Sequence, residues 1–420
     1  NLYRKSLSLR KTKTDKVDAH TIATMLMSDV NLKSYSDTSY HNEELKSLTR
    51  YRFDKVKERA KLKSSVSRLV CILFPELEKL VPTLHMASVY ALLSEFPGAS
   101  FVAFSHLTRL ANLLSESSKG RYGKDTAIMY ELIQVGPRSY YINAPVKIGL
   151  SLLQDNQVCL IDSGNDKDAG RKIRQLLEQH GWQLQMILNT HSNADHIGGN
   201  QYLQKQTGCH IYAPGIECAL TRHPLLEPSY LYGGFPPKDL RHKFLLAQPS
   251  QAEYLTDDVL PKGWKMLPLP GHFFNMVGFE TEDGVIYLAD CLSSKETLAK
   301  YQIGVLYDVG AYLDTLQRVK TLRAHCFVPA HAEATDDIAP LAQYNIDHTH
   351  QVAEHILTLC QEPICFEHLL QKLFDLYHLT MDFSQYVLVG STVRSYLSWL
   401  KDKGALSVSF DTRIPLWKRL

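Results

Sequence analysis

The sequence predicts an α/β domain placed between a mostly helical N-terminal segment and a C-terminal module of helices and a hairpin. Residues 41–73 hold apolar side chains at helical spacing among alternating charges. Short strand-like runs then alternate with helical patterns from residue 129 to about residue 340. Residues 344–420 have the pattern of three helices followed by a hairpin. We therefore expect three domains, with bounds 1–128, 129–343 and 344–420.

In the N-terminal segment we expect helices at about 15–28, 41–73, 84–95 and 99–117. The second is long and its pattern is typical of an exposed coiled-coil arm, with Pro75 and Pro82 after it. In the middle segment we expect strands at 129–135, 139–143, 158–162 and 185–188, and helices at 168–180 and 200–207. In the C-terminal module we expect helices at 366–377 and 391–400 and a hairpin at 405–419.

The net charge of +2 for the 420 residues conceals an asymmetry between the N-terminal segment and the rest. Residues 1–128 contain 21 Lys and Arg against 13 Asp and Glu, whereas residues 129–420 contain 25 against 31. Such an asymmetry makes the basic segment the candidate for contact with nucleic acid. Hydrophobic residues make up 45% of the chain and charged residues 21%, a globular composition that excludes a disordered chain.

The cysteines and the start of the chain bear on its compartment. None of the eight cysteines forms a C-x-x-C pair, and several lie in apolar runs, so we expect reduced, buried thiols in a cytoplasmic protein. The first residues lack the apolar stretch of a signal peptide, and the chain has no run of 18 apolar residues that would predict a membrane span. Because the chain starts with Asn1 and not Met, we interpret it as a fragment of something longer.

A group of candidate metal ligands lies in the segment Thr190–Asn200, directly after an apolar strand and before a helix. His191, Asp195 and His196 fall within six residues, so a loop at the end of the strand can bring them to one point. Imidazole nitrogen and carboxylate oxygen are the ligands that zinc takes. Gly198 and Gly199 allow a tight backbone at the start of the helix.

Three further candidate ligands follow in order, each at the end of an apolar run or turn: His272, Asp290 and His331. With the upstream Leu160–Asn165, this series resembles the metallo-β-lactamase superfamily, over roughly residues 129–341. The resemblance implies an αββα sandwich with a metal site at one edge. It assigns His191 and His272 to the first metal subsite, Asp195, His196 and His331 to the second, Asp290 to both, and Asp162 to the layer behind the ligands.

One position departs from the pattern of that superfamily. Asn193 stands where the H-x-H-x-D-H signature has its second His, and an amide oxygen is a weaker zinc ligand than imidazole. We therefore expect the second subsite to fill first and the first to be weak or metal-selective. Two interpretations stay open: an enzyme with one metal or an altered pair, or an inert site.

The chemistry implied is metal-assisted hydrolysis of a small ester, thioester or lactone by a metal-bound water, with one or two zinc ions, or iron or manganese, as cofactor. Asp195 is the candidate to hold the water and accept its proton. Tyr230 and Tyr232 are predicted to lie on a loop that either frames the substrate pocket or simply packs. The acidic balance of residues 129–420 argues against a nuclease.

The C-terminal module, 344–420, resembles the winged-helix modules that some members of the superfamily append. Winged helices can bind nucleic acid. The last predicted helix and its end carry only Arg394, Lys401 and Lys403 as basic residues, so packing or homodimer formation is the favoured role.

The N-terminal segment resembles another family. Asp15 and Asp18 lie three residues apart and thus on one helix face, where a carboxylate pair can hold magnesium. Residues 1–127 resemble the RuvC-like DEDD transposases of insertion sequences, in the Piv-related group, and these two residues match the last two acidic positions of that family. Ser94–Gly98 resembles the opening of its C-terminal domain.

The strands that carry the other acidic residues of that family are absent, so we interpret residues 1–128 as a truncated transposase fragment. Gene fusion would have joined this fragment in frame just before Met129, the natural start of the hydrolase. The alternative functions are therefore a transposase-derived DNA-binding protein, with non-specific contacts to phosphates, and an inert pseudoenzyme.

Overall fold

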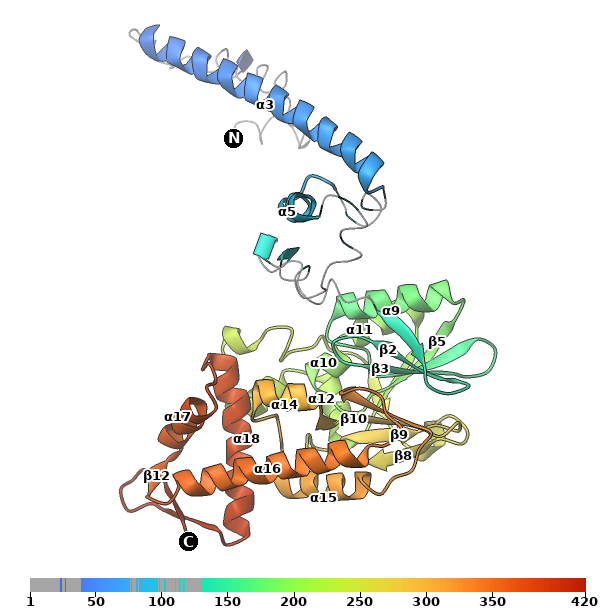
Figure 1. Ribbon diagram of the computed structural model, residues 1–420, viewed down its shortest axis with the longest axis vertical. Coiled ribbons are helices and arrows are strands. Elements are labelled where there is room, and N and C mark those ends of the chain that lie inside the picture. Colours follow the sequence, from blue (N-terminus) through green and yellow to red (C-terminus); the bar gives the residue numbers. More distant parts are fainter. Residues whose placement is uncertain are drawn as a thin grey trace. The chain divides into compact units, whose positions relative to one another are not determined.

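The computed structural model describes residues 39–75, 83–96 and 130–420, together with isolated residues between 23 and 117. The chain divides into two compact units, Asn1–Arg121 and Tyr122–Leu420, which are described separately (Figure 1). Asp15, Asp18 and Met129 lie outside the described residues, as does most of the helices expected at 15–28 and 99–117.

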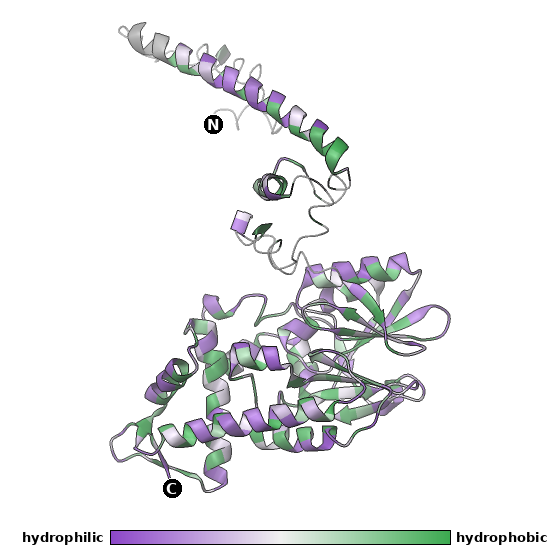
Figure 2. Ribbon diagram, in the orientation of Figure 1, coloured by the Kyte–Doolittle hydropathy of each residue, from purple (hydrophilic) through white to green (hydrophobic). Residues whose placement is uncertain are grey.

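The first unit is helical where it is described. The long helix α3 spans Ser39–Leu73, close to the predicted bounds, and α5 spans Ala87–Glu95. Figure 2 colours most of α3 as hydrophilic, with hydrophobic residues gathered at its C-terminal end. Val70 and Phe74 belong there to a small core with Val89 and Leu92 of α5. Residues 45–62 of α3 are exposed, which agrees with the expectation of an exposed helix.

The first sheet of the second unit has seven strands in sequence order. The strands β1 to β4 are antiparallel, and β4 to β7 are parallel. They span Glu131–Gln134 (β1), Ser139–Asn143 (β2), Ile148–Leu152 (β3), Gln157–Ile161 (β4), Gln183–Leu188 (β5), His210–Ala213 (β6) and Ala252–Tyr254 (β7). The parallel strands need crossover helices, and the outer face of the sheet carries α9 (Lys167–Gln179), α11 (Asn200–Thr207) and α12 (Gly215–Arg222).

The second sheet has four strands in the order β11-β10-β9-β8. They span Lys265–Pro268 (β8), Val277–Glu280 (β9), Val285–Ser293 (β10) and Cys326–His331 (β11). The strands β10 and β11 are parallel, and the others are antiparallel. On this side of the molecule lie α14 (Lys295–Tyr301), α15 (Val309–Val319) and α16 (Ala339–Leu359).

Three hydrophobic cores define four layers in the second unit. One core holds buried residues of both sheets, such as Cys159 and Leu188 from the first and Phe279 and Val328 from the second, so the sheets pack face to face. A second core lies between the first sheet and its helices. A third joins the second sheet to α15, α16 and the C-terminal helices. The architecture is therefore the predicted αββα sandwich.

The C-terminal part contains α16, α17 (Phe366–Leu376), α18 (Phe383–Asp402) and a small sheet in the order β12-β14-β13. Its strands span Ile364–Cys365 (β12), Leu406–Ser409 (β13) and Leu416–Arg419 (β14). The predicted hairpin is present. The last helix begins at Phe383, earlier than the predicted residue 391, because the side chain of Asp382 caps it by accepting from the backbone N–H of Gln385 at 2.8 Å.

This C-terminal part shares its core with the second sheet. The cluster that contains Leu288 of β10 also contains Ile346 of α16, Leu370 of α17 and Val393 of α18. The side chain of Asn345 accepts from the backbone N–H of Ser293 and donates to its carbonyl, both at 2.9 Å. The domain boundary expected at residues 343 and 344 thus falls inside α16 and stays a prediction.

All eight cysteines are free thiols, and five of them are buried. In the described part of the chain, we find no helix with the length and apolarity needed to cross a bilayer.

Candidate metal centre

The loop between β5 and α11 carries four of the predicted site residues. His191 and Asn193 follow β5, and the short helix α10 (Ala194–Ile197) presents Asp195 and His196. His191 and His196 are fully buried, and their imidazole centroids lie 4.0 Å apart. The first motif therefore folds onto a single point at the end of a parallel strand, as its spacing predicts.

Gly198 and Gly199 hold this loop against the loop after β4. A Cβ atom at Gly198 would lie 2.2 Å from the backbone carbon of Asn165, and one at Gly199 would lie 2.3 Å from the carbonyl oxygen of Ser163. The backbone N–H of Ser163 donates to the carbonyl of His196 at 2.8 Å. Only glycine fits this approach, because any side chain would push the two loops apart.

The second sheet contributes the other three residues. His272 lies in the turn between β8 and β9, Asp290 lies in β10, and His331 ends β11. The register of β10 shifts on either side of Ala289, and Ala289 has a positive φ of 50°. A bulge of this kind re-aims a side chain. It explains why Asp290 turns towards the ligands of the other sheet instead of pairing regularly with β11.

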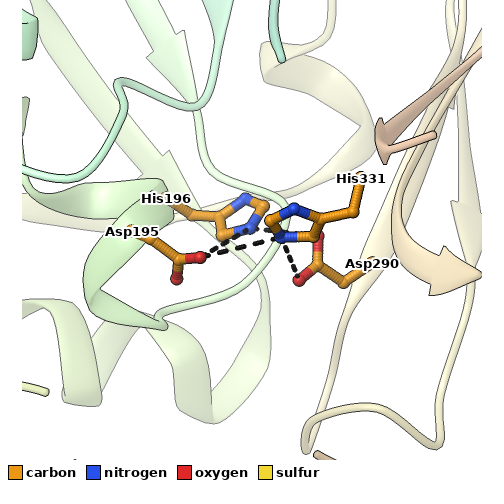
Figure 3. A group of neighbouring side chains, drawn as sticks. All are labelled: Asp195, His196, Asp290 and His331. Carbon is orange, nitrogen blue, oxygen red and sulfur yellow. Dashed lines mark ion pairs between the residues drawn. The ribbon is translucent and has the colours of Figure 1, made fainter. Parts of the chain in front are cut away.

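Four residues form one candidate metal subsite, shown in Figure 3 with the two imidazoles between the two carboxylates. The Nε2 atom of His196 lies 3.0 Å from Oδ1 of Asp290 and 4.0 Å from Oδ2 of Asp195. The Nε2 atom of His331 lies 3.2 Å from Oδ2 of Asp290 and 3.7 Å from Oδ2 of Asp195. Asp195 keeps 34% of its side chain exposed and His331 26%, so solvent reaches this side.

His191, His272 and Asp290 form a second group that shares Asp290 with the first. The Nε2 atom of His272 lies 3.6 Å from Oδ2 of Asp290 and 3.1 Å from Oδ1 of Asn193. Asn193 thus brings its amide oxygen to the edge of this subsite. The structure therefore brings together all seven residues predicted as ligands, although their roles as ligands stay predictions.

The donor set fits a divalent ion. The ligand atoms in each group lie within 4.8 Å of one another. Nε2 of His191 is buried without a hydrogen-bond partner, and Nε2 of His196 and Oδ1 of Asp290 have only each other, as an ion pair at 3.0 Å. Buried polar atoms without hydrogen bonds are costly, and a cation bound by these two groups would satisfy them. Imidazole and carboxylate donors suit zinc, iron and manganese.

Asp162 forms hydrogen bonds behind two of the candidate ligands. Its Oδ2 accepts from Nδ1 of His196 at 2.7 Å and from the hydroxyl of Thr190 at 2.7 Å, while Oδ1 accepts from the backbone N–H of Thr190 at 2.8 Å. The Thr190 hydroxyl also lies 2.9 Å from Nδ1 of His191. Asp162 therefore orients one imidazole directly and another through Thr190.

Two buried carboxylates behind the first subsite were missed by sequence reasoning. Glu217 of α12 accepts from the backbone N–H of Ser192 at 3.1 Å, from its hydroxyl at 2.6 Å and from the backbone N–H of Asn275 at 2.8 Å. Glu227 of α13 (Leu226–Tyr232) accepts from the amide of Asn193 at 2.6 Å. The only signal in the sequence was an isolated acidic residue in each of two largely uncharged stretches, which no motif marks.

Electrostatics in the site follow from burial and from the clustered charges. Burial acts to raise the pKa of Asp195, but His196 and His331 outweigh it and hold that pKa at about 2. Burial acts to lower the pKa of His331, but Asp290 and Asp195 outweigh it and raise the pKa to about 10. Burial holds the pKa of His191 well below its ordinary value, so this imidazole is neutral and ready to bind metal.

A cavity of about 860 Å³ lies between α13, the start of α15 and α18. Tyr230 and Tyr232 line it, on a helix and not on the predicted loop. Ring contacts connect its wall with the centre: Tyr230 packs edge-on against Phe273 at 6.4 Å, and Phe273 packs edge-on against His191 at 6.2 Å. Tyr307, also on the wall, donates its backbone N–H to the carbonyl of His272 at 3.1 Å.

The αββα sandwich and the histidine–carboxylate cluster at its edge define the class: the protein is a metallohydrolase. The family model of the metallo-beta-lactamase superfamily matches residues 148–331, which agrees with the resemblance of this segment. A transposase family model matches residues 1–75, which agrees with the N-terminal resemblance.

Curated relatives carry the name hydroxyacylglutathione hydrolase. The protein from Methylococcus capsulatus is 28% identical over 210 residues, which is 46% of this chain and 68% of that protein. The protein from Pseudomonas entomophila is 37% identical over 79 residues, 18% of this chain and 29% of that protein. The matched regions therefore cover only part of each relative.

Solved structures agree on the fold. A beta-lactamase domain protein from Burkholderia ambifaria has a TM-score of 0.55 at 17% identity, over 69% of this chain and 94% of that chain. A metallo-beta-lactamase family protein from Thermus thermophilus has a TM-score of 0.54 at 19% identity, over 68% of this chain and 100% of that chain. At these identities the likeness concerns the fold alone.

Proposed function

We propose that the unit Tyr122–Leu420 is a metal-dependent hydrolase of a thioester between a small acyl group and an organic thiol. The observation that carries the proposal is the cluster of imidazoles and carboxylates around the shared Asp290. The names of the two relatives favour a thioester over an oxygen ester or a lactone. The expected ions are zinc, iron or manganese.

Each proposed metal ion has its own set of ligands, and Asp290 belongs to both sets. His196, His331, Asp195 and Asp290 would hold one ion, and His191, His272, Asn193 and Asp290 a second. A bound ion supplies Lewis acidity to the substrate carbonyl and lowers the pKa of water. The low pKa of Asp195 keeps its carboxylate ionised, and its partial exposure lets that oxygen hold an incoming water and accept its proton.

The cavity lined by Tyr230 and Tyr307 is the proposed binding region for the substrate. Its wall combines the aromatic rings of Tyr230 and Tyr307 with the cations Arg394 and Lys403, and Asp308 adds an anion. Aromatic and charged groups of both signs suit an organic thiol that carries its own amine and carboxylate groups. We expect Tyr230→Ala to raise KM severalfold more than it lowers kcat, because Tyr230 contacts no predicted metal ligand.

The test measures metal content and thioester hydrolysis on the same full-length preparation. One or two equivalents of a divalent metal, with release of thiol from a hydroxyacylglutathione, would support the proposal. Asp195→Ala should abolish hydrolysis, whereas the matched control Asp258→Ala, on the exposed surface, should leave it unchanged. Absence of bound metal after addition of zinc would contradict the proposal and favour the alternative that the protein is an inert pseudoenzyme.

Non-specific DNA binding by the first unit is the second candidate function. Residues 45–73 of α3 carry nine Lys and Arg against two acidic residues, and most of these side chains are exposed. We expect the triple change Arg50→Ala, Lys57→Ala and Lys61→Ala in the full chain to weaken binding to duplex DNA and to flatten its salt dependence. Equal binding by the unchanged and changed chains would exclude α3 as the DNA contact.

A further inference from the structure

Glu227 is a buried carboxylate that the proposed hydrolysis does not use. Its side chain lies on α13 and is only 4% exposed. Within the described part of the chain, no Lys or Arg forms an ion pair with it. Its oxygen instead accepts a short hydrogen bond, 2.6 Å, from the amide of Asn193. Burial of a carboxyl group costs free energy unless hydrogen bonds or ion pairs compensate for the lost hydration.

That contact decides which end of the Asn193 amide faces the metal centre. An amide has an oxygen that can bind a cation and an NH₂ group that cannot. The NH₂ group of Asn193 donates to Oε1 of Glu227, and Oδ1 of Asn193 lies 3.1 Å from Nε2 of His272. With the amide turned over, its NH₂ group would face the cluster and the metal.

Glu217 fixes the backbone on which this amide sits. It accepts from the backbone N–H of Ser192, the residue before Asn193, and from that of Asn275 in the loop of His272. The two loops that supply the first subsite are therefore joined through one carboxyl group. Asn193 cannot leave the subsite by a movement of its own loop alone. The orientation of its amide group therefore depends on the hydrogen bond with Glu227.

We propose that Glu227 is a positioning residue that presents the amide oxygen of Asn193 to the first subsite as a ligand for a divalent ion. The inference rests on the proposed metal-dependent function. The subsite then offers two imidazole nitrogens, from His191 and His272, and two oxygens, from Asn193 and Asp290. The second subsite also offers two imidazoles and two oxygens, but both of its oxygens belong to carboxylates, so the neutral amide is what distinguishes the first subsite.

A purely structural role is the competing explanation, in which Glu227 only ties α13 to the loop. A double-mutant cycle separates the two. If Glu227 acts through Asn193, its replacement matters only while Asn193 is present. If it ties the helix to the loop as a whole, its replacement costs the same in an Asn193→Ala background.

The experiment follows Mn²⁺ binding to the full chain preloaded with one equivalent of Zn²⁺, by electron paramagnetic resonance of the free ion. Glu227→Met removes the acceptor and keeps the volume, and we expect it to weaken Mn²⁺ binding about 10- to 100-fold. Glu227→Gln keeps an oxygen acceptor, and we expect it to bind Mn²⁺ within about threefold of the unchanged chain. The exposed Glu362→Ala is the matched control and should change nothing.

The outcomes separate the two proposals. A loss in Glu227→Met that vanishes in the Asn193→Ala background, with the first equivalent of Zn²⁺ still bound, supports the inference. Unchanged Mn²⁺ affinity in Glu227→Met, or the same loss in both backgrounds, overturns it and leaves the hydrolase intact. A chain that binds neither ion overturns the hydrolase proposal and the inference together.

Discussion

The two halves of the metal centre share Asp290 but are supported in different ways. The subsite of His196 and His331 is an ion-pair cluster in which every proposed ligand is an imidazole or a carboxylate. The subsite of His191 and His272 includes a neutral amide, and two buried carboxyl groups stand behind its loops. Where the signature histidine is missing, the first subsite has an amide oxygen held by a buried carboxyl group, so the two subsites differ in the charge of one oxygen donor.

The largest effect on activity should come from the subsite of His196 and His331. We expect His196→Ala to lower thioester hydrolysis by about 10³-fold, since a metal supplies several kcal/mol of transition-state stabilisation and each 1.36 kcal/mol is tenfold in rate. Steady-state kinetics and metal content give the measurement. His210→Ala, in an exposed histidine outside the cluster, is the control. Activity retained in His196→Ala would contradict this prediction, because the subsite of His191 and His272 would then suffice for hydrolysis.

The pH dependence of the free energy of unfolding should report on Glu217, the buried carboxyl group behind the subsite of His191 and His272. Burial raises the pKa of Glu217 to about 7 from an ordinary value of 4.5. The folded protein therefore keeps this proton more readily than the unfolded chain, and ionisation of Glu217 costs stability that is lost as pH rises from 4.5 through 7. Relative to the unchanged chain, Glu217→Gln should gain up to about 3 kcal/mol in free energy of unfolding over this range.

Denaturant unfolding of both chains at pH 4.5, 6 and 7.5, with a chelator present, provides the measurement. The Gln variant starts from a lower stability, because its NH₂ group cannot accept the backbone N–H that the carboxylate accepts. Only the change with pH is diagnostic. A pH-independent difference between the two chains would show that Glu217 does not titrate in this range.

A change in Asp162 should affect both halves together. Asp162 holds His196 directly and His191 through Thr190, so Asp162→Asn should weaken metal binding about 10- to 100-fold at each subsite. Asn also tolerates the positive φ of 65° at this position, so the backbone should be kept. Stepwise zinc titration checks the prediction. A loss confined to the subsite of His196 would mean that the hydrogen bonds through Thr190 do not orient His191.

The smallest effect should come from replacing the amide. Asn193→His restores an imidazole, which Glu227 can still orient by accepting its N–H. We expect zinc affinity of the first subsite to rise roughly tenfold, while that of the second subsite stays unchanged. Competition with a zinc-sensitive dye resolves the two steps. Weaker zinc binding would show that the space near Glu227 fits only an amide.

Most of the candidate ligand positions could be predicted because they lie at or after the end of a strand, and strand ends meet at a shared edge; Asp290 lies inside β10. The register of β10 around Ala289, which turns Asp290 inwards, leaves no mark in the sequence. Glu217 and Glu227 could not be predicted either, because their partners lie 25 to 58 residues away and depend on how α12 and α13 pack. The sequence predicts a loop at Tyr230 and Tyr232, whereas both residues lie on α13.

The hydrogen bonds between Asn345 and Ser293 have a genetic consequence. They hold the chain directly after Asp290, and α16, which supplies Asn345, packs in one core with the second sheet. A stop codon or frameshift after residue 343 would therefore remove the packing that supports β10, the strand that carries Asp290. Such alleles should score as complete nulls in a selection for hydrolysis, like substitutions of the ligands themselves.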